Sequence, residues 1–80
     1  MIFEYSKHWI KQRRFRPEIT DDIIELCIAN SDKLRDKTWK DVCNAVSRIT
    51  PSGRILKVVY KEIFKRESKH IKIITAFWLD

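Results

Sequence analysis

Residues 54–60, RILKVVY, decide the fold, because β-branched and aromatic side chains fill a stretch in which apolar and charged residues partly alternate. Two other stretches have the same character: VCNAVSRI at residues 42–49 and HIKIITAFW at residues 70–78. The sequence therefore predicts three strands. Between the first two, residues 50–53 (TPSG) predict a tight turn, since the single glycine of the chain can take the positive φ that such turns require.

The connection between the second and third strands, residues 65–69 (KRESK), is short, polar and charged. Short connections of this kind join antiparallel neighbours. The three strands are therefore expected to form an antiparallel sheet.

Two helices are predicted before these strands. Residues 20–30, TDDIIELCIAN, place apolar side chains at helical spacing after a capping Thr20. Residues 7–15, KHWIKQRRF, predict a helix that Ser6 caps and that ends near Arg16, because the residue before a proline is pushed out of helical geometry.

Residues 2–5, IFEY, predict a short leading strand. The predicted order is thus (β)ααβββ, an α+β fold in which two helices pack on a small antiparallel sheet, in one domain of residues 1–80. A chain of 80 residues buries only about 60% of its unfolded surface on folding. We therefore expect a binding partner or a second copy to add stability.

The chain carries 17 basic and 11 acidic residues, for a net charge of +6. Such a charge favours polyanions, and nucleic acid is the leading class of partner. The acidic residues concentrate in residues 18–32, which hold five of them and no basic residue. This segment is either a solvated surface or a partner for basic residues on a neighbouring element.

Several classes of site and location are excluded or disfavoured. The cysteines Cys27 and Cys43 are not spaced as metal ligands, and one glycine cannot form a phosphate-binding loop, so neither a metal nor a cofactor is expected. No apolar run is long enough to span a membrane. The start, residues 1–4, lacks the pattern of a signal peptide, which predicts a cytoplasmic protein.

Three motifs carry a family resemblance: SKH at residues 6–8, GRILKVVY at residues 53–60 and IITAFW at residues 73–78. Over residues 5–78 the chain resembles the RelE-like toxin superfamily, and most closely a small branch of unknown function, related to the BrnT toxins, that has a Ser-x-His start. The resemblance implies a RelE/BrnT-like fold, a type II toxin–antitoxin role, RNA cleavage, and neutralisation by a cognate antitoxin.

The chain departs from this branch at Gln12, where the branch usually has an arginine four residues after the histidine. Arg13 and Arg16 are the two candidates for that arginine. The chain also stops after the last predicted strand, whereas BrnT-like proteins continue with a basic segment.

Metal-independent RNA cleavage by the 2′-hydroxyl needs a group that transfers protons and cations that face the phosphorane. The candidate catalytic residues are therefore His8, Arg13, Arg16 and Arg54. For His8, an ordinary packing or backbone contact at the helix start is the alternative.

Six further basic residues are candidates for RNA binding. Lys7, Lys11 and Arg14 share one stripe of the first helix, whereas the others lie in or beside the predicted strands. Whether the strand residues share a face depends on a register that the sequence does not determine, and solvated strand faces are the alternative. The six candidates are Lys7, Lys11, Arg14, Arg48, Lys57 and Lys72.

Aromatic residues and the second histidine are assigned to structure. Trp9, together with Ile10, and Trp78 are expected to pack in the core, whereas Trp39 lies in a predicted loop. His70 is expected to be a surface residue.

Three functional hypotheses follow. The first is an RNA endonuclease toxin held by an antitoxin. The second is a non-catalytic module of the same fold that binds nucleic acid or an acidic protein through its basic surface. The third, compatible with both, is a homodimer or partner subunit in which another chain completes the sheet at the edge formed by residues 71–78.

Overall fold

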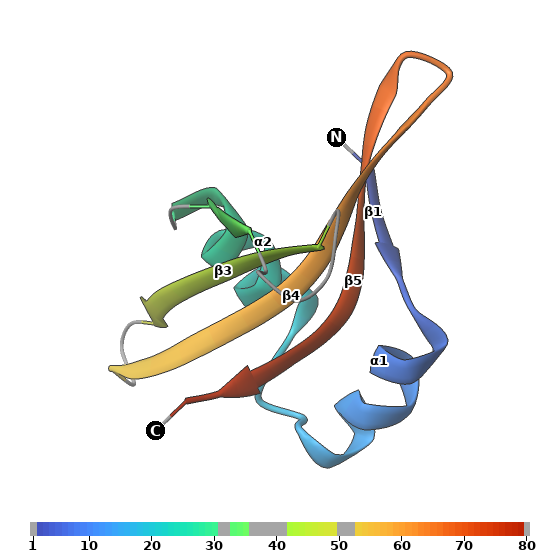
Figure 1. Ribbon diagram of the computed structural model, residues 1–80. Helices are drawn as coiled ribbons and strands as arrows, with labels where there is room; N and C mark the ends of the chain where they lie inside the picture. Colours follow the sequence, from blue (N-terminus) through green and yellow to red (C-terminus); the bar gives the residue numbers. More distant parts are fainter. Residues whose placement is uncertain (1, 31–32, 36–41, 50–52, 80) are drawn as a thin grey trace.

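The computed structural model describes residues 2–30, 33–35, 42–49 and 53–79. It is an α+β fold in which a curled sheet carries helices on one side (Figure 1). In chain order the elements are β1 (Ile2–Tyr5), α1 (Lys7–Gln12), the 3-10 helix η1 (Arg13–Phe15), α2 (Asp21–Asn30), β2 (Lys33–Arg35), β3 (Val42–Ile49), β4 (Arg54–Lys65) and β5 (Ser68–Trp78).

The five described strands form one sheet in the order β1-β5-β4-β3-β2. The leading strand and the three long strands are confirmed, but the prediction of an antiparallel sheet is wrong at one edge. There β1 pairs parallel with β5, with Ile2 opposite His70 and Tyr5 opposite Ile73. The direction of this pairing depends on the path of the whole chain between β1 and β5, which local sequence does not encode. The sheet is therefore mixed.

β5 has a strand on each side only over part of its length. β4 pairs with it from Ser68 to Trp78, and β1 covers its other side from His70 to Ile73. The edge proposed for residues 71–78 is thus occupied by β1 at residues 71–73. β2 is a strand that the sequence analysis did not predict, and it pairs antiparallel with β3. Trp39 and turn residues 50–52 lie outside the described residues.

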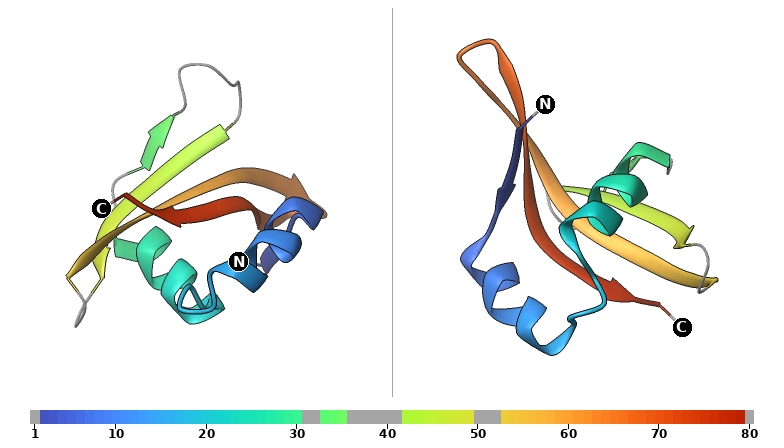
Figure 2. Two further views of the ribbon diagram at one scale, coloured as in Figure 1. Left: turned by 90° about the horizontal axis from the view of Figure 1, so that it is seen from below. Right: turned by 180° about the vertical axis from the view of Figure 1, so that it is seen from behind.

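Both helices pack on the same face of the sheet, as the left view of Figure 2 shows. Trp9 of α1 is fully buried, as predicted, but Ile10 is 40% exposed because only one side of this six-residue helix meets the sheet. No described helix is long and apolar enough to cross a membrane. The fully buried large side chains are Trp9, Ile24, Cys27, Leu56, Val58, Tyr60, Ile71 and Ile73.

Ser6 joins the start of α1 to β5. Its Oγ accepts a hydrogen bond from the Trp9 backbone N–H at 3.1 Å, as a helix cap does, and donates one to the Ile74 carbonyl at 2.9 Å. Its own N–H donates to the Ile73 carbonyl at 2.9 Å. The α-helix ends at Gln12 and continues as the 3-10 turn η1, so the predicted helix over residues 7–15 is confirmed in position but tightens at its end.

The carbonyl that Ser6 binds belongs to an irregularity in β5. Tyr60 stands opposite Ile73 and Val59 stands opposite Thr75, so Ile74 is an extra residue, a β-bulge. A bulge shifts the side-chain alternation by one position. Consequently Ile73 and Ala76, three residues apart, are both buried under the helices.

The connection between β4 and β5 is tighter than predicted. Lys65 pairs with Ser68, which leaves a two-residue turn at Arg66 and Glu67. Both turn residues have positive φ, 49° and 64°. Two-residue hairpin turns of this geometry favour asparagine and glycine, so KRES carries no sequence signal for it. Gly53 also has positive φ, 74°, as predicted for the other turn.

Ser6 both caps α1 and binds the Ile74 carbonyl, so its hydroxyl is expected to contribute to stability. Ser6→Ala removes the cap of α1 and leaves the Ile74 carbonyl without this donor, so we expect the free energy of unfolding to fall by about 1–3 kcal/mol in urea denaturation. Thr20→Ala is the matched control, because Thr20 caps α2 through one long, exposed hydrogen bond of 3.4 Å. It should cost less than about 1 kcal/mol. Equal losses would contradict the role given to Ser6.

Candidate nucleic-acid interface

The predicted catalytic residues of the first helix lie around α1 and η1. His8 is exposed on α1, and Arg13 is exposed in η1, where its Nη1 lies 3.9 Å from Asp21 Oδ1. Arg16 is half-buried and donates a hydrogen bond of 2.8 Å to Gln12 Oε1. Among the described residues, no hydrogen bond or ion pair joins His8 to either arginine.

Arg54, the fourth predicted catalytic residue, begins β4 on the helix side of the sheet. It stands opposite the buried Ile49. Its guanidinium lies 4.3 Å from the centroid of the Trp78 ring and 3.8 Å from Glu18 Oε1. Trp78 is half-buried and packs against the core, as predicted. The catalytic assignment of these four residues stays a prediction.

Gln12, the position that departs from the toxin branch, has a structural role. Its Oε1 accepts hydrogen bonds from Arg16 at 2.8 Å and from the Thr75 hydroxyl at 2.7 Å. Gln12 therefore ties the end of α1 both to the residue before Pro17 and to β5. A side chain with an acceptor oxygen suits this position, because that oxygen receives an arginine and a hydroxyl donor at once, which an arginine side chain could not do.

The acidic segment pairs with basic residues on neighbouring elements. Asp21 contacts Arg13 and Glu18 contacts Arg54, although all four side chains are 41–54% exposed, so the pairs add little stability. Burial raises the pKa of the Tyr5 hydroxyl above its ordinary value, and Asp21 raises it further. The negative charge of the helix side is thus concentrated in the acidic segment, next to the cations of α1 and η1.

The opposite face of the sheet collects positive charge, because the register places the basic strand residues on it. Lys57 stands between Val46 of β3 and Phe77 of β5. Lys61 stands opposite Lys72. These side chains alternate with buried residues such as Val58 and Tyr60, so they point away from the helices.

We call this surface the open face, since no described helix covers it. Three of the six predicted RNA-binding residues, Arg48, Lys57 and Lys72, lie on it. Lys61 and Lys65 belong to it as well and were missed, although alternation along β4 could have indicated them. The described side chains of β1, β3, β4 and β5 bring to the open face five lysine and arginine residues, namely Arg48, Lys57, Lys61, Lys65 and Lys72, and one carboxylate, Glu4.

Apolar side chains lie between these cations. They are partly exposed and alternate with the lysines along β4 or face them from β3 and β5. The Nζ of Lys57 lies 5.9 Å from the centroid of the Phe77 ring. The open face therefore offers charged groups for phosphates and apolar surface for bases on one side of the sheet. The apolar members are Val46, Ile55, Val59, Ile63 and Phe77.

The other three predicted RNA-binding residues are elsewhere. Lys7, Lys11 and Arg14 are exposed on α1 and η1, on the helix side. Phe15 beside them is 86% exposed. The predicted basic residues thus form two groups on different sides of the molecule.

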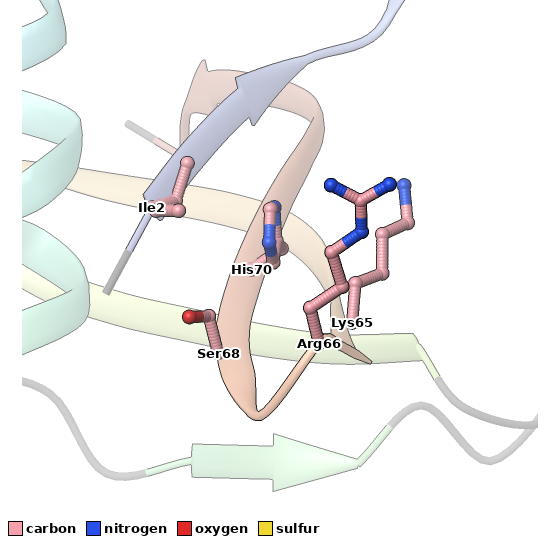
Figure 3. Close-up of a pocket in the computed structure, with 5 residues that line it drawn as sticks. All are labelled: Ile2, Lys65, Arg66, Ser68 and His70. Carbon is pink, nitrogen blue, oxygen red and sulfur yellow. The ribbon is translucent and has the colours of Figure 1, made fainter.

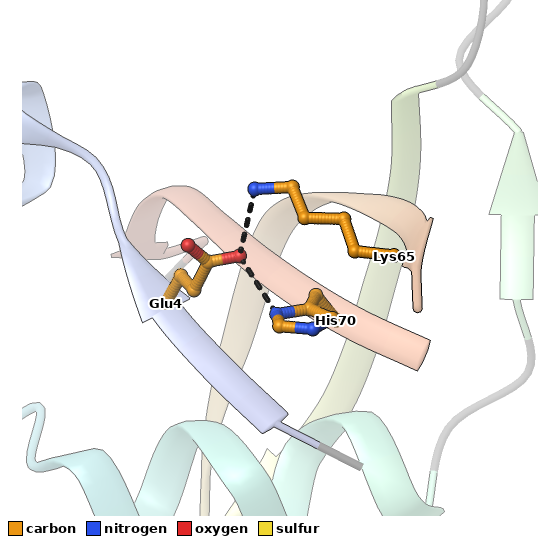
Figure 4. Close-up of polar contacts among 3 residues, drawn as sticks. All are labelled: Glu4, Lys65 and His70. Carbon is orange, nitrogen blue, oxygen red and sulfur yellow. Dashed lines mark hydrogen bonds and ion pairs between the residues drawn. The ribbon is translucent and has the colours of Figure 1, made fainter. Parts of the chain in front are cut away.

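A pocket of about 430 Å³ lies at one end of the open face, lined by Ile2, Lys65, Arg66, Ser68 and His70 (Figure 3). The expectation that His70 is a surface residue holds only in part, because its side chain is 17% exposed and lines this pocket. Its Nδ1 lies 3.1 Å from Glu4 Oε2 (Figure 4). The same carboxylate oxygen is 3.9 Å from Lys65 Nζ. This cluster has no signal in the local sequence, because the parallel pairing of β1 with β5 creates it.

Comparison of the chain with protein-family models, with curated proteins and with solved structures found no match in any of the three. The resemblance to RelE-like and BrnT toxins therefore stays a prediction. In the described part of the chain, no group of three histidine, cysteine, aspartate or glutamate side chains could hold a metal ion.

The two cysteines are free and differ in burial. Cys27 is fully buried beneath the sheet, and burial raises its pKa to about 11. At pH 8 only about one Cys27 thiol in a thousand would be ionised. Cys43 is half-buried.

We expect iodoacetamide at pH 8 to modify Cys43 in the folded protein and to leave Cys27 intact. Mass spectrometry of proteolytic fragments would locate the label, and unfolding in urea before labelling should make both cysteines reactive. Rapid labelling of Cys27 in the folded protein would contradict its placement under the sheet.

Proposed function

We propose that the protein binds single-stranded RNA through the open face of its sheet. The observation that carries the proposal is the pairing of β1, β3, β4 and β5, which among the described residues gathers five cations and one carboxylate on a surface that no described helix covers. The net charge of +6 supports the same class of ligand.

The chemistry of the open face suits a flexible strand. Each lysine or arginine that meets a phosphate releases a counterion, which favours binding at low salt. Partly exposed side chains such as Phe77 and Val59 offer surface on which unstacked bases can lie. A single strand can present phosphates and bases to one surface together, whereas a duplex hides its bases.

A second candidate function is RNA cleavage by a toxin that an antitoxin neutralises, as the resemblance implies. The observation that favours it is the contact between Glu4 and His70 beside Lys65. A carboxylate that holds one imidazole nitrogen orients the ring for proton transfer, and a neighbouring cation can stabilise charge on a phosphate. In this proposal His70 joins His8 as a candidate for proton transfer.

The binding proposal is tested with two matched triple variants. The open-face variant is Lys57→Gln, Lys61→Gln and Lys72→Gln, and the helix variant is Lys7→Gln, Lys11→Gln and Arg14→Gln. Both remove three charges. Fluorescence anisotropy with a labelled single-stranded RNA should show that the open-face variant loses roughly 10- to 100-fold in affinity and that its salt slope falls by about 2. Circular dichroism checks that both variants fold.

For the helix variant, the dissociation constant for RNA should lie within about threefold of that of the original chain, once the loss of three units of net charge is taken into account. A larger loss in the helix variant than in the open-face variant would contradict the proposal. Equal binding of DNA of the same sequence would make the ligand single-stranded nucleic acid in general. A denaturing gel of the same mixtures tests cleavage, which His70→Ala should abolish if the second candidate is correct.

A further inference from the structure

The pocket at the end of the open face combines an apolar wall with groups that bind anions. Ile2 is 48% exposed and forms part of the wall. Figure 3 shows the side chains of Lys65 and Arg66 side by side. In this view Ile2 and Ser68 lie on the other side of His70. The long aliphatic stems of lysine and arginine add apolar surface below their charged ends. The volume of about 430 Å³ is in the range of small-molecule sites.

His70 is held in one orientation in this pocket. Its Nδ1 contacts Glu4 Oε2 at 3.1 Å, and the other ring nitrogen, Nε2, has no hydrogen-bond partner among the described residues. Because the Glu4 carboxylate can only accept, Nδ1 donates the ring proton and Nε2 is left as a hydrogen-bond acceptor that a ligand can use. His70 comes from β5 and Glu4 from β1, so the parallel pair of strands builds the site.

The charge balance of the pocket favours an anion. Among the described residues, Glu4 is the carboxylate that forms ion pairs with the lining, and it is shared by His70 and Lys65 (Figure 4). Arg66 adds a further positive charge. It occupies a turn position with φ of 49°, where asparagine or glycine would fit with less strain. The turn thereby fixes the base of an arginine side chain at the mouth of the pocket.

We propose that this pocket binds one nucleotide of the RNA strand. The phosphate lies between Lys65 and Arg66, and the base lies against Ile2 and the aliphatic stems. Nε2 of His70, an acceptor because Nδ1 donates to Glu4, receives a hydroxyl of the ribose. The inference rests on the proposed RNA binding. It adds the place at which a single nucleotide is held, next to Lys72, which neighbours Glu4 in the sheet. Inorganic phosphate would leave the apolar wall unused, so a nucleotide should bind more tightly than phosphate.

The test is a titration of the ¹⁵N-labelled full chain, followed by two-dimensional NMR, with adenosine 5′-monophosphate, adenosine and inorganic phosphate as separate probes. The monophosphate should shift the amide signals of residues 2–5 and 65–72 with a dissociation constant in the millimolar range, about that of a single weak contact site. Adenosine and phosphate alone should each bind at least about fivefold more weakly.

Two variants of the turn make the test specific. Arg66→Asn removes the cation and retains a residue that accepts positive φ, so the hairpin should stay intact. It should weaken binding of the monophosphate at least fivefold, on the order expected for a lost charge-assisted hydrogen bond. Glu67→Asn alters the neighbouring position of the same turn and should not weaken binding.

Absence of localised shifts at saturating monophosphate would overturn the nucleotide pocket, as would equal effects of the two variants or equal affinity for inorganic phosphate. If RNA still bound and depended on Lys57, Lys61 and Lys72, the open face would stand while the pocket failed. Localised binding of the monophosphate without any binding of RNA would support a nucleotide site and overturn the proposed RNA function.

Discussion

The register of β3, β4 and β5 is the constraint on which the rest of the structure depends. It determines which side chains meet the helices and which face solvent, and a slip of one residue would exchange the two sets. The bulge at Ile74 keeps Ile73 and Ala76 on the buried side. Ser6 holds that bulge and starts α1, so the core and the helix are coupled at one hydrogen-bonded contact.

This register separates the charges of the molecule. Arg54 on the helix side contacts Glu18, and Arg13 contacts Asp21, so the acidic segment pairs with two arginines there, while Lys7, Lys11 and Arg14 on the same side stay exposed. On the open face, Lys57 and Lys61 have no acidic neighbour opposite them in the adjacent strands, and Lys72 stands beside Glu4 of β1. The open face therefore has the higher ratio of cations to carboxylates among the described residues, and the proposed binding of RNA rests on that ratio. The proposed catalytic residue Arg54 lies on the side away from the open face.

Local signals in the sequence predicted much of the fold. The three long strands, the caps Ser6 and Thr20 and the positive φ of Gly53 follow from side-chain type and spacing, and all are observed. The parallel pairing of β1 was not predictable, because it joins residues 68 positions apart in the chain. The turn at residues 66–67 was not predictable either, since it contains neither glycine nor asparagine.

The candidate site also combines residues that local sequence identifies with contacts that depend on non-local strand pairing. Arg48, Lys57 and Lys72 were named from their charge, but only cross-strand register shows that they share a face. Lys61 follows from alternation with Lys57 along β4 and could have been found. The contact of His70 with Glu4 depends on the parallel edge, which the sequence did not reveal. Local sequence therefore identified the chemistry, and non-local pairing determined where it lies.

The measurement that tests the central claim most directly is lysine acetylation of the folded chain, with and without single-stranded RNA, read residue by residue by mass spectrometry. The open face predicts that RNA protects Lys57, Lys61 and Lys72, while Lys7 and Lys11 on α1 stay as reactive as in the free protein. Protection of Lys7 and Lys11 with unchanged reactivity of the three sheet lysines would contradict the account.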